Sequence, residues 1–356
     1  MERPGGVGSE QQGIGRRAQR RWWLGYRQVN LLLEALVAAA LVTGLASWLV
    51  PQSIARPVVV AHAISGLLII VVAPFKVRGP VRVGFRRGRP DRWVSVAFGI
   101  LVIATVVVGL LHATGLWFGV GVWSALWTHQ LFGFAVLPLA VWHVITRPVR
   151  PSITDLDRRA ALTTGAAAAV AATVLVAQEV AVRVGGAAGA DRAGTGSHAV
   201  GSFDPIRMPT VQWLNDVAPS DPDPARWRLN VAGAPVEIAT LWEQTSTVVA
   251  RIDCTGGWYA DQRWDAVALS SLLPQQVHGR SVVVTSITGY GRRFAVSDLD
   301  RLYLAVGYDG SPLRTGHGAP VRLLVTDARG FNWVKWVTEV SISDRPSWLQ
   351  LPFPPT

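Results

Sequence analysis

Cysteine is nearly absent from this chain: Cys254 is the only one among its 356 residues. A single thiol excludes an internal disulfide, an iron–sulfur cluster and a covalently attached c-type haem, because each of these needs at least two cysteines. Two interpretations of Cys254 remain, an inert buried thiol or a single thiolate that ligates or attacks something. Taken alone, a lone cysteine favours the inert thiol.

Long hydrophobic runs fill the first half of the chain, and half of all residues are hydrophobic. Each run has about the 17–25 residues that an α-helix needs to cross a bilayer. Five such runs in succession, separated by short polar loops, predict a polytopic membrane domain rather than a globular core. The runs are Val29–Val50, Val58–Phe75, Val94–Leu111, Trp127–Ile145 and Ala160–Val182.

Acidic residues are scarce in the same half, where residues 1–159 hold 18 Lys and Arg against 6 Asp and Glu. Residues 160–356 hold 16 against 17. Arginines crowd the N-terminus and alternate loops, whereas the first-to-second loop has only Arg56 and the Ala113–Leu126 loop has no charge. This asymmetry is a topology signal rather than a nucleic-acid footprint. It predicts a cytoplasmic N-terminus and an external C-terminal domain. The crowded positions are Arg16, Arg17, Arg20, Arg21 and Arg27, then Lys76, Arg78, Arg82, Arg86, Arg87, Arg89 and Arg92, then Arg147, Arg150, Arg158 and Arg159.

The fifth run opens with Asp157-Arg158-Arg159-Ala160-Ala161-Leu162. We interpret it as a twin-arginine export signal inside the chain, the alternative being two arginines that anchor a helix end. Such export suits a cofactor that is loaded in the cytoplasm and crosses within a folded domain. Ala188-Gly189-Ala190 offers a cleavage site. We nevertheless expect the domain to be retained, because four preceding helices suggest that electrons pass between the two parts.

These patterns divide the chain into a basic N-terminus (1–27), a five-helix membrane domain (28–183), a Gly/Ala/Ser-rich flexible linker (184–204) and a C-terminal domain (205–356). Short β-branched runs punctuated by Gly and Pro predict a mixed α+β class for the last part. Strands are expected at Arg228–Val231, Val248–Ile252, Val282–Ile287, Leu302–Val306, Val321–Val325 and Val334–Ile342, and short helices at Ile238–Gln244, Leu269–Leu273 and Ser297–Leu302.

An ordered set of motifs follows Cys254. It comprises Arg251-Ile252-Asp253-Cys254-Thr255-Gly256-Gly257-Trp258, then Tyr290-Gly291-Arg292-Arg293, then His317-Gly318-Ala319-Pro320-Val321-Arg322, Arg329-Gly330-Phe331 and Trp333-Val334-Lys335-Trp336. The set resembles the molybdopterin-binding domain of the sulfite oxidase family, which includes the bacterial periplasmic methionine sulfoxide reductase catalytic subunits. The resemblance covers roughly Arg226 to Ser343 and reverses the preference for an inert Cys254.

The resemblance implies that the Cys254 thiolate ligates molybdenum and that His317, Arg322 and Lys335 hold the anionic pterin cofactor. It also implies that Gly318 and Gly330 permit close backbone approach. The alternative for Arg322 and Lys335 is that they are solvated surface charges.

Tyr290 and Arg292 lie where the family places residues near the metal or the phosphate, so we expect catalytic roles for them. Tyr290 is expected to donate a hydrogen bond to a substrate oxygen, and an arginine to attract an anion. The family's N-terminal cofactor element, rich in Asn, Arg or His, is not evident, and Met208–Trp213 stands in its place. The substrate, sulfite, methionine sulfoxide or another, therefore stays open.

Four histidines, His62, His112, His129 and His143, lie in or beside the apolar runs, where ionisable groups usually mark function. His129 and His143 are fourteen residues apart, roughly 21 Å along one face of a helix, and resemble the haem-binding helices of b-type membrane cytochromes. On the predicted topology, His62 and His129 form the better pair for haem iron and His143 lies alone near the inner surface. One haem b, two haems or purely structural histidines all stay open.

The sequence thus predicts a multi-pass protein of the bacterial cytoplasmic membrane, with a molybdenum-molybdopterin oxidoreductase domain outside. Expected partners are a small-molecule or protein-bound redox substrate, a membrane quinone or other electron carrier, and the export machinery, but no nucleic acid. The alternative is a non-catalytic binding or assembly module with a degenerate molybdopterin fold on a membrane anchor.

Overall fold

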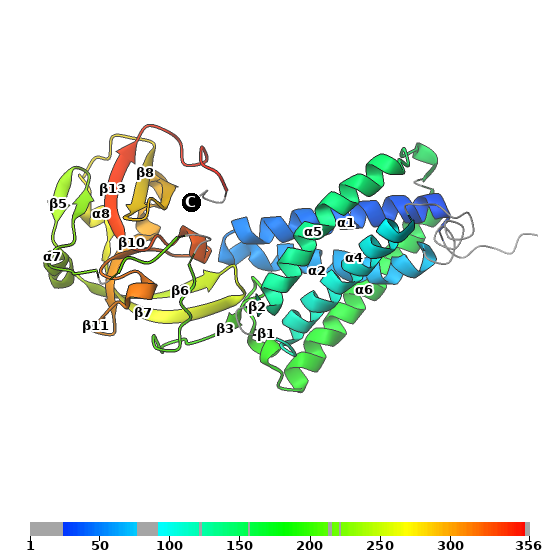
Figure 1. The fold of residues 1–356 in the computed structure, drawn as a ribbon, viewed down its shortest axis with the longest axis horizontal. Helices are drawn as coiled ribbons and strands as arrows, with labels where there is room; N and C mark the ends of the chain where they lie inside the picture. The colour runs from blue at the N-terminus through cyan, green and yellow to red at the C-terminus, as the bar shows by residue number, and fades with distance from the viewer. Residues whose placement is uncertain are drawn as a thin grey trace, which may run out of the picture.

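The computed structural model describes residues 24–76, 92–120, 123–155, 157–212, 216–220 and 222–352. In these residues the chain forms a bundle of long helices at one end and a domain built on two β-sheets at the other (Figure 1). Several basic residues used above for topology fall outside the described residues, namely Arg16, Arg17, Arg20, Arg21, Arg78, Arg82, Arg86, Arg87 and Arg89.

All five apolar runs form α-helices that are long and apolar enough to cross a membrane. Only 6–22% of the most apolar window of each helix is buried inside the protein. The remaining apolar surface faces outwards, which is the arrangement that lipid contact requires. The helices are α1 (Tyr26–Leu49), α2 (Ala55–Lys76), α4 (Arg92–Thr114), α5 (Ala125–Thr146) and α6 (Arg158–Val184).

Capping residues set where the last two helices begin. The Ser124 hydroxyl accepts a hydrogen bond from Trp127 N at 3.0 Å, so α5 starts immediately after it. The Asp157 carboxylate accepts from Ala160 N at 2.6 Å and starts α6 in the same way. Arg158 and Arg159 therefore occupy the first turn of α6.

The end of the bundle distant from the sheets is tied together by charge. Arg27 Nε, at the start of α1, donates to Asp155 Oδ1 at 2.8 Å, in the connection between α5 and α6. The start of α1 and this connection thus share one end of the bundle. The sheet domain covers the other end (Figure 1).

The sheet domain contains a six-stranded and a five-stranded sheet. In the first, β11 (Ser311–Pro312), β10 (Leu302–Tyr308), β7 (Trp258–Ala268) and β3 (His198–Ala199) follow one another, with β12 (Arg322–Val325) on β10 and β6 (Ser246–Cys254) on β7. In the second the order is β5 (Ala234–Val236), β4 (Leu229–Val231), β13 (Val337–Ser343), β8 (Ser281–Ser286) and β9 (Gly291–Ala295). A two-stranded ribbon, β1 (Gly119–Val120) and β2 (Trp123–Ser124), precedes α5.

The predicted strands all appear, and one core of buried apolar side chains joins them with α7 (Ile238–Glu243) and α8 (Leu269–Leu272). The third predicted helix is a 3₁₀-helix at Val296–Arg301 instead, with i to i+3 hydrogen bonds that suit a single short turn. Strands β7 and β9 were not predicted, because polar and charged residues interrupt their apolar pattern.

The segment expected to be a flexible linker has fixed structure. Residues Ala188–Asp191 form a 3₁₀-helix and His198–Ala199 pair with β7. Ser197 is 1% exposed, and its hydroxyl donates to Asp253 Oδ1 at 2.7 Å. Small residues therefore allow close packing here rather than free movement.

Candidate functional site

Cys254 is the last residue of β6, at the start of the tight turn that leads into β7. The turn is closed by Gly257 N, which donates to Cys254 O at 3.0 Å, and Gly257 has a φ of +92° that favours glycine. Gly256 N donates to Cys254 Sγ at 3.3 Å. Burial raises the pKa of the Cys254 thiol, although this N–H and Arg329 oppose the rise. A bound metal ion is what would hold such a buried sulfur as a thiolate.

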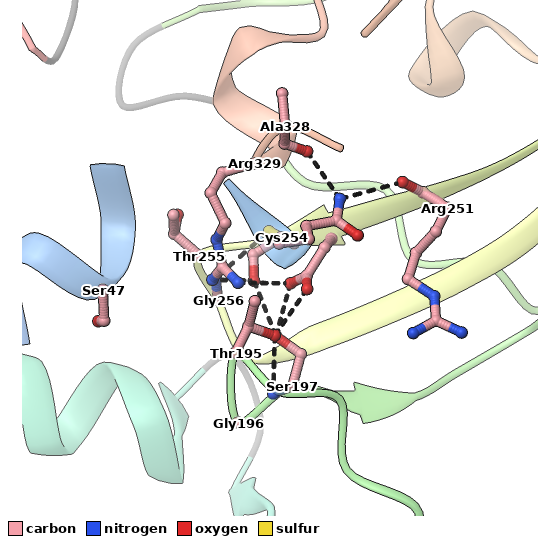
Figure 2. A network of polar contacts seen from close by, with 12 residues as sticks. Ser47, Thr195, Gly196, Ser197, Arg251, Cys254, Thr255, Gly256, Ala328 and Arg329 are labelled. Atoms are coloured by element: carbon pink, nitrogen blue, oxygen red, sulfur yellow. Dashed lines mark hydrogen bonds and ion pairs between the residues drawn. The ribbon is translucent and has the colours of Figure 1, made fainter. Parts of the chain in front are cut away.

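A buried network around Asp253 holds the turn, and Figure 2 shows three of its members, Thr195, Ser197 and Arg329, near Cys254. Asp253 is fully buried, and its carboxylate lies 2.8 Å from Arg329 Nη1. Thr195 and Ser197 hydroxyls donate to the same carboxylate at 2.6 and 2.7 Å. Arg329 Nη2 also donates to Cys254 O at 3.3 Å. Three segments distant in sequence thus fix the backbone beside Cys254.

Cys254 opens onto a cavity of about 640 Å³, a volume that includes its mouth to solvent. The cavity lies where both sheets meet residues 208–212, Asp216 and the segment 317–335 that contains β12. Its lining residues are Met208, Pro209, Val211, Gln212, Asp216, Ile252, Cys254, Trp258, Tyr290, His317, Arg322, Gly330, Phe331, Trp333 and Lys335.

One wall of the cavity is cationic. Arg322 is 1% exposed, lies over the rings of Trp264 and Trp333 at 5.2 and 5.4 Å, and donates through Nη1 to His317 O at 2.8 Å. Burial lowers its pKa to about 9. Burial and the charge of Arg322 together lower the pKa of Lys335 to about 7 and that of His317 to about 4. Among the described residues no carboxylate forms an ion pair with Arg322. An anionic ligand would supply the missing charge.

Several buried polar atoms on the cavity wall have no hydrogen-bond partner within the described part of the chain. They are Arg322 Nε, Trp258 Nε1, Trp333 Nε1 and Asp216 Oδ1. Buried polar atoms are rarely left unpaired in proteins, because each unsatisfied group costs about 1–3 kcal/mol. Three donors and one acceptor facing one space fit a ligand that is rich in acceptors and carries at least one donor. A pterin bearing a phosphate has this character.

Six of the eight predicted residues of the molybdenum site line this one cavity: Cys254, Tyr290, His317, Gly330, Arg322 and Lys335. The hydroxyl of Tyr290 donates to Phe331 O, so it is not directed at a substrate as we expected. Lys335 Nζ donates to Val211 O and Gly316 O at 2.8 and 2.6 Å. It thereby ties two loops of the wall together.

The other two predicted residues do not line the cavity. Arg292 donates from Nε to Asn332 Oδ1 at 3.0 Å, next to the cavity residues Phe331 and Trp333. It supports the wall from behind. An added Cβ on Gly318 would meet the Cβ atoms of Arg322 and Lys335 at 3.0 and 3.1 Å. Gly318 therefore lets these two cationic residues approach each other, rather than opening space for a ligand.

The residues that position the site were not predicted from the sequence. Arg329 and Asp253 are part of the motifs quoted above. Their ion pair could not be predicted from the sequence, because 76 positions separate them. Lys335 itself was predicted, and the composition supports that prediction separately: the chain has only two lysines, Lys76 and Lys335, and uses arginine elsewhere. A lysine kept at one position in an arginine-rich chain marks a place where a compact charge is needed.

His62 and His129, the pair predicted to ligate haem iron, lie next to each other in the helical bundle. The ring centroids of His62 and His129 lie 5.7 Å apart at an interplanar angle of 89°. Each Nδ1 lies within hydrogen-bond distance of a backbone carbonyl, Ala40 O at 2.9 Å and Thr105 O at 2.8 Å. Donation from both Nδ1 atoms leaves both Nε2 atoms as lone-pair donors, which is the tautomer that a metal-ligating histidine needs.

Glycines on the facing helices make room for both rings. An added Cβ would lie 3.1 Å from the His62 ring at Gly44 and 2.9 Å from the His129 ring at Gly109. His143 is distant from this pair and has its Nε2 3.2 Å from Lys76 Nζ. His112 lies at the sheet end of α4, with its ring 4.8 Å from that of His198. The described residues contain no cluster of three or more His, Cys, Asp or Glu that could hold a metal ion by themselves.

Residues 216–350 match the family model described as the oxidoreductase molybdopterin binding domain. This match supports an oxidoreductase, so the predicted enzyme class is confirmed. Among solved structures, the chain is similar to the sulfane dehydrogenase SoxCD from Paracoccus pantotrophus. The identity is 24%, the match covers 35% of this chain and 40% of that chain, and the TM-score is 0.33. No curated protein matches the chain. The family match does not extend to the helical bundle, so its haem stays a prediction.

The unmatched cations predict a pH dependence of stability in the cofactor-free full-length protein. The pKa of Lys335 is about 7 in the fold and 10.5 in the unfolded chain. Between these values the unfolded state binds more protons, so the free energy of unfolding should rise with pH, by at most about 1.4 kcal/mol per pH unit. Thermal unfolding from pH 7 to 9 should show this rise, and Lys335→Met should flatten it. Equal slopes in both proteins would show that Lys335 is not held deprotonated in the fold.

Proposed function

We propose that this chain is a membrane-anchored, molybdenum-dependent oxidoreductase that performs oxygen-atom transfer outside the membrane. Its membrane domain would exchange the electrons with quinone or haem. The observation that carries the proposal is the cavity that brings the only cysteine together with His317 and the basic side chains of Arg322 and Lys335. Apart from four residues between Met208 and Gln212, its lining belongs to the segment that matches the molybdopterin-binding family.

In this proposal Cys254 supplies one thiolate to molybdenum, and His317, Arg322 and Lys335 hold the anionic pterin. The cofactor supplies a metal that changes by two electrons and carries the oxygen atom. The protein's part is to bind, orient and shield it. The turn of Cys254 is fixed by the Asp253 network, and the indole rings of Trp258 and Trp333 wall the site. The substrate, a small molecule or a protein-bound group, enters through the cavity mouth.

His62 and His129 are the proposed ligands of one haem b. The free Nε2 atoms, the backbone acceptors on both Nδ1 atoms and the facing glycines support this assignment. Two axial imidazoles suit electron transfer, because they leave no open position on the iron. His143, beside Lys76, is not part of the proposed site.

The proposed location is the bacterial cytoplasmic membrane, with the N-terminus inside and the sheet domain outside. Arg27 and Arg150 lie at the bundle end opposite the sheets, which agrees with an excess of positive charge on the cytoplasmic side. Arg158 and Arg159 sit at a helix N-terminus, where positive charge opposes the helix dipole. Helix stability therefore does not explain these two arginines, and a role in export explains them better.

Retention of the sheet domain after export is supported by Gly189, in the middle of the candidate cleavage site. Gly189 is buried, and an added Cβ on it would lie 2.5 Å from Ala113 O at the end of α4. A protease would have to detach this segment from the bundle before cleaving it.

Cys254→Ser tests the proposal. A hydroxyl is a poor ligand for a soft metal at neutral pH, so the variant should fold but lose oxygen-atom transfer by at least about a hundred-fold. Molybdenum content and activity are measured side by side on the full-length protein. Val249→Ser, 63% exposed on the same strand, is the control and should keep both. Full activity in Cys254→Ser would refute the molybdenum assignment.

The haem proposal has its own test. Purified full-length protein should show a reducible b-type absorbance spectrum, and His129→Ala should remove or strongly weaken it while molybdenum content is unchanged. His143→Ala is the matched control at the other end of the helix and should keep the spectrum. If the wild-type protein contains no haem when the cells are supplied with haem, the haem proposal is refuted. The bundle would then serve as an anchor or a quinone site.

A further inference from the structure

The turn that carries Cys254 rests directly on the helical bundle. The side chain of Gln130, on α5, donates from Nε2 to Thr255 O at 3.0 Å. Thr255 follows Cys254, and Gln130 follows His129. One hydrogen bond thus joins the residues next to the proposed molybdenum ligand and next to a proposed haem ligand.

The two glycines of the turn allow this contact. An added Cβ on Gly257 would lie 2.9 Å from both His112 Cε1 and Leu126 Cδ2. One on Gly256 would lie 3.5 Å from Trp127 Nε1 and 3.4 Å from Cys254 Sγ. Any other residue at Gly257 would lift the turn off the ends of α4 and α5. The Gly256-Gly257 pair therefore serves the contact between the domains as well as the shape of the turn.

We propose that Gln130 is a positioning residue that seats the Cys254 turn on the outer ends of α4 and α5. The importance of this contact rests on the proposed function, because the contact fixes the sulfur of Cys254, the proposed metal ligand, relative to His129. A continuous path of this chain's own bonds then runs from His129 through the Gln130 side chain and Thr255 to Cys254. The sheet domain works from one docked position and does not swing on a linker.

A second contact between the domains provides a matched control. Gln52, in the turn before α2, donates from Nε2 to Ala328 O at 2.8 Å and to Arg251 O at 3.3 Å. Gln52 and Gln130 are both half-buried glutamines that bridge the bundle to backbone carbonyls of the sheet domain. Only Gln130 reaches the residue next to Cys254.

The experiment compares Gln130→Met with Gln52→Met in cofactor-free full-length protein. Methionine keeps the length of the side chain and its helix preference but removes the donor. Because the chain has one cysteine, the rate of alkylation by N-ethylmaleimide reports on Cys254 alone. We expect about a five-fold faster reaction in Gln130→Met, the scale of one lost neutral hydrogen bond, and no change in Gln52→Met. Equal rates in all three proteins, or equal acceleration in both variants, would overturn the proposal.

Hydrogen exchange of the 254–258 backbone amides gives a second measurement and includes Gln130→Ala, in case the methionine variant folds poorly. Faster exchange confined to this turn is expected in the Gln130 variants. Unchanged exchange would contradict the proposal that Gln130 holds the Cys254 turn on α4 and α5. In molybdenum-loaded protein, Gln130→Met should shift the Mo(V) electron paramagnetic resonance signal at unchanged metal content. A wild-type chain that binds no molybdenum would refute the proposed function. The alkylation and exchange results would still decide whether Gln130 positions the Cys254 turn.

Discussion

The carboxylate of Asp253 has no exposure to solvent, and the site is organised around the need to match its charge. An isolated buried carboxylate would be far too costly to keep ionised. Arg329 satisfies it from one part of the chain, and Thr195 and Ser197 satisfy it from another. The network therefore joins the end of β6, the segment before β3 and the loop after β12. Cys254 is placed by its covalent bond to the residue that this network holds.

The cavity next to that network, in contrast, has positive charge that no carboxylate in the described residues pairs with. Arg322, Lys335 and His317 face one space without a carboxylate to pair with Arg322 among the described residues, and four polar wall atoms lack partners there. Such a site is unfavourable when it is empty and selective for an acceptor-rich anion. The burial that lowers the pKa of Lys335 makes its charged form costly in the empty site, and the anion of the proposed cofactor would favour that charged form. The seat of the Cys254 turn on α4 and α5 then makes one functional unit of two domains.

Much of this could be predicted from the sequence, for physical reasons that are clear in each case. Apolar runs of this length satisfy their backbone hydrogen bonds in a membrane by forming helices. The ends of the five helices were therefore predicted to within a few residues. Cys254, His317, Arg322 and Lys335 were predicted as one site from ordered motifs. Strand β7 was missed because Gln262, a polar residue, is fully buried there through its bond to Gly201 O. The Asp253–Arg329 pair and the Gln130–Thr255 contact join positions far apart in sequence, and only the three-dimensional fold reveals such pairs.

Molybdenum X-ray absorption on the purified full-length protein tests the central claim, that Cys254 is a ligand of a pterin-bound molybdenum, most directly. The scattering shell counts sulfur neighbours independently of any substrate. One pterin dithiolene contributes two sulfurs, and the Cys254 thiolate should contribute a third at bonding distance. Three sulfurs per molybdenum is the predicted result. A protein that contains molybdenum with only two sulfur ligands, or that contains none after expression in molybdenum-replete cells, would contradict this account.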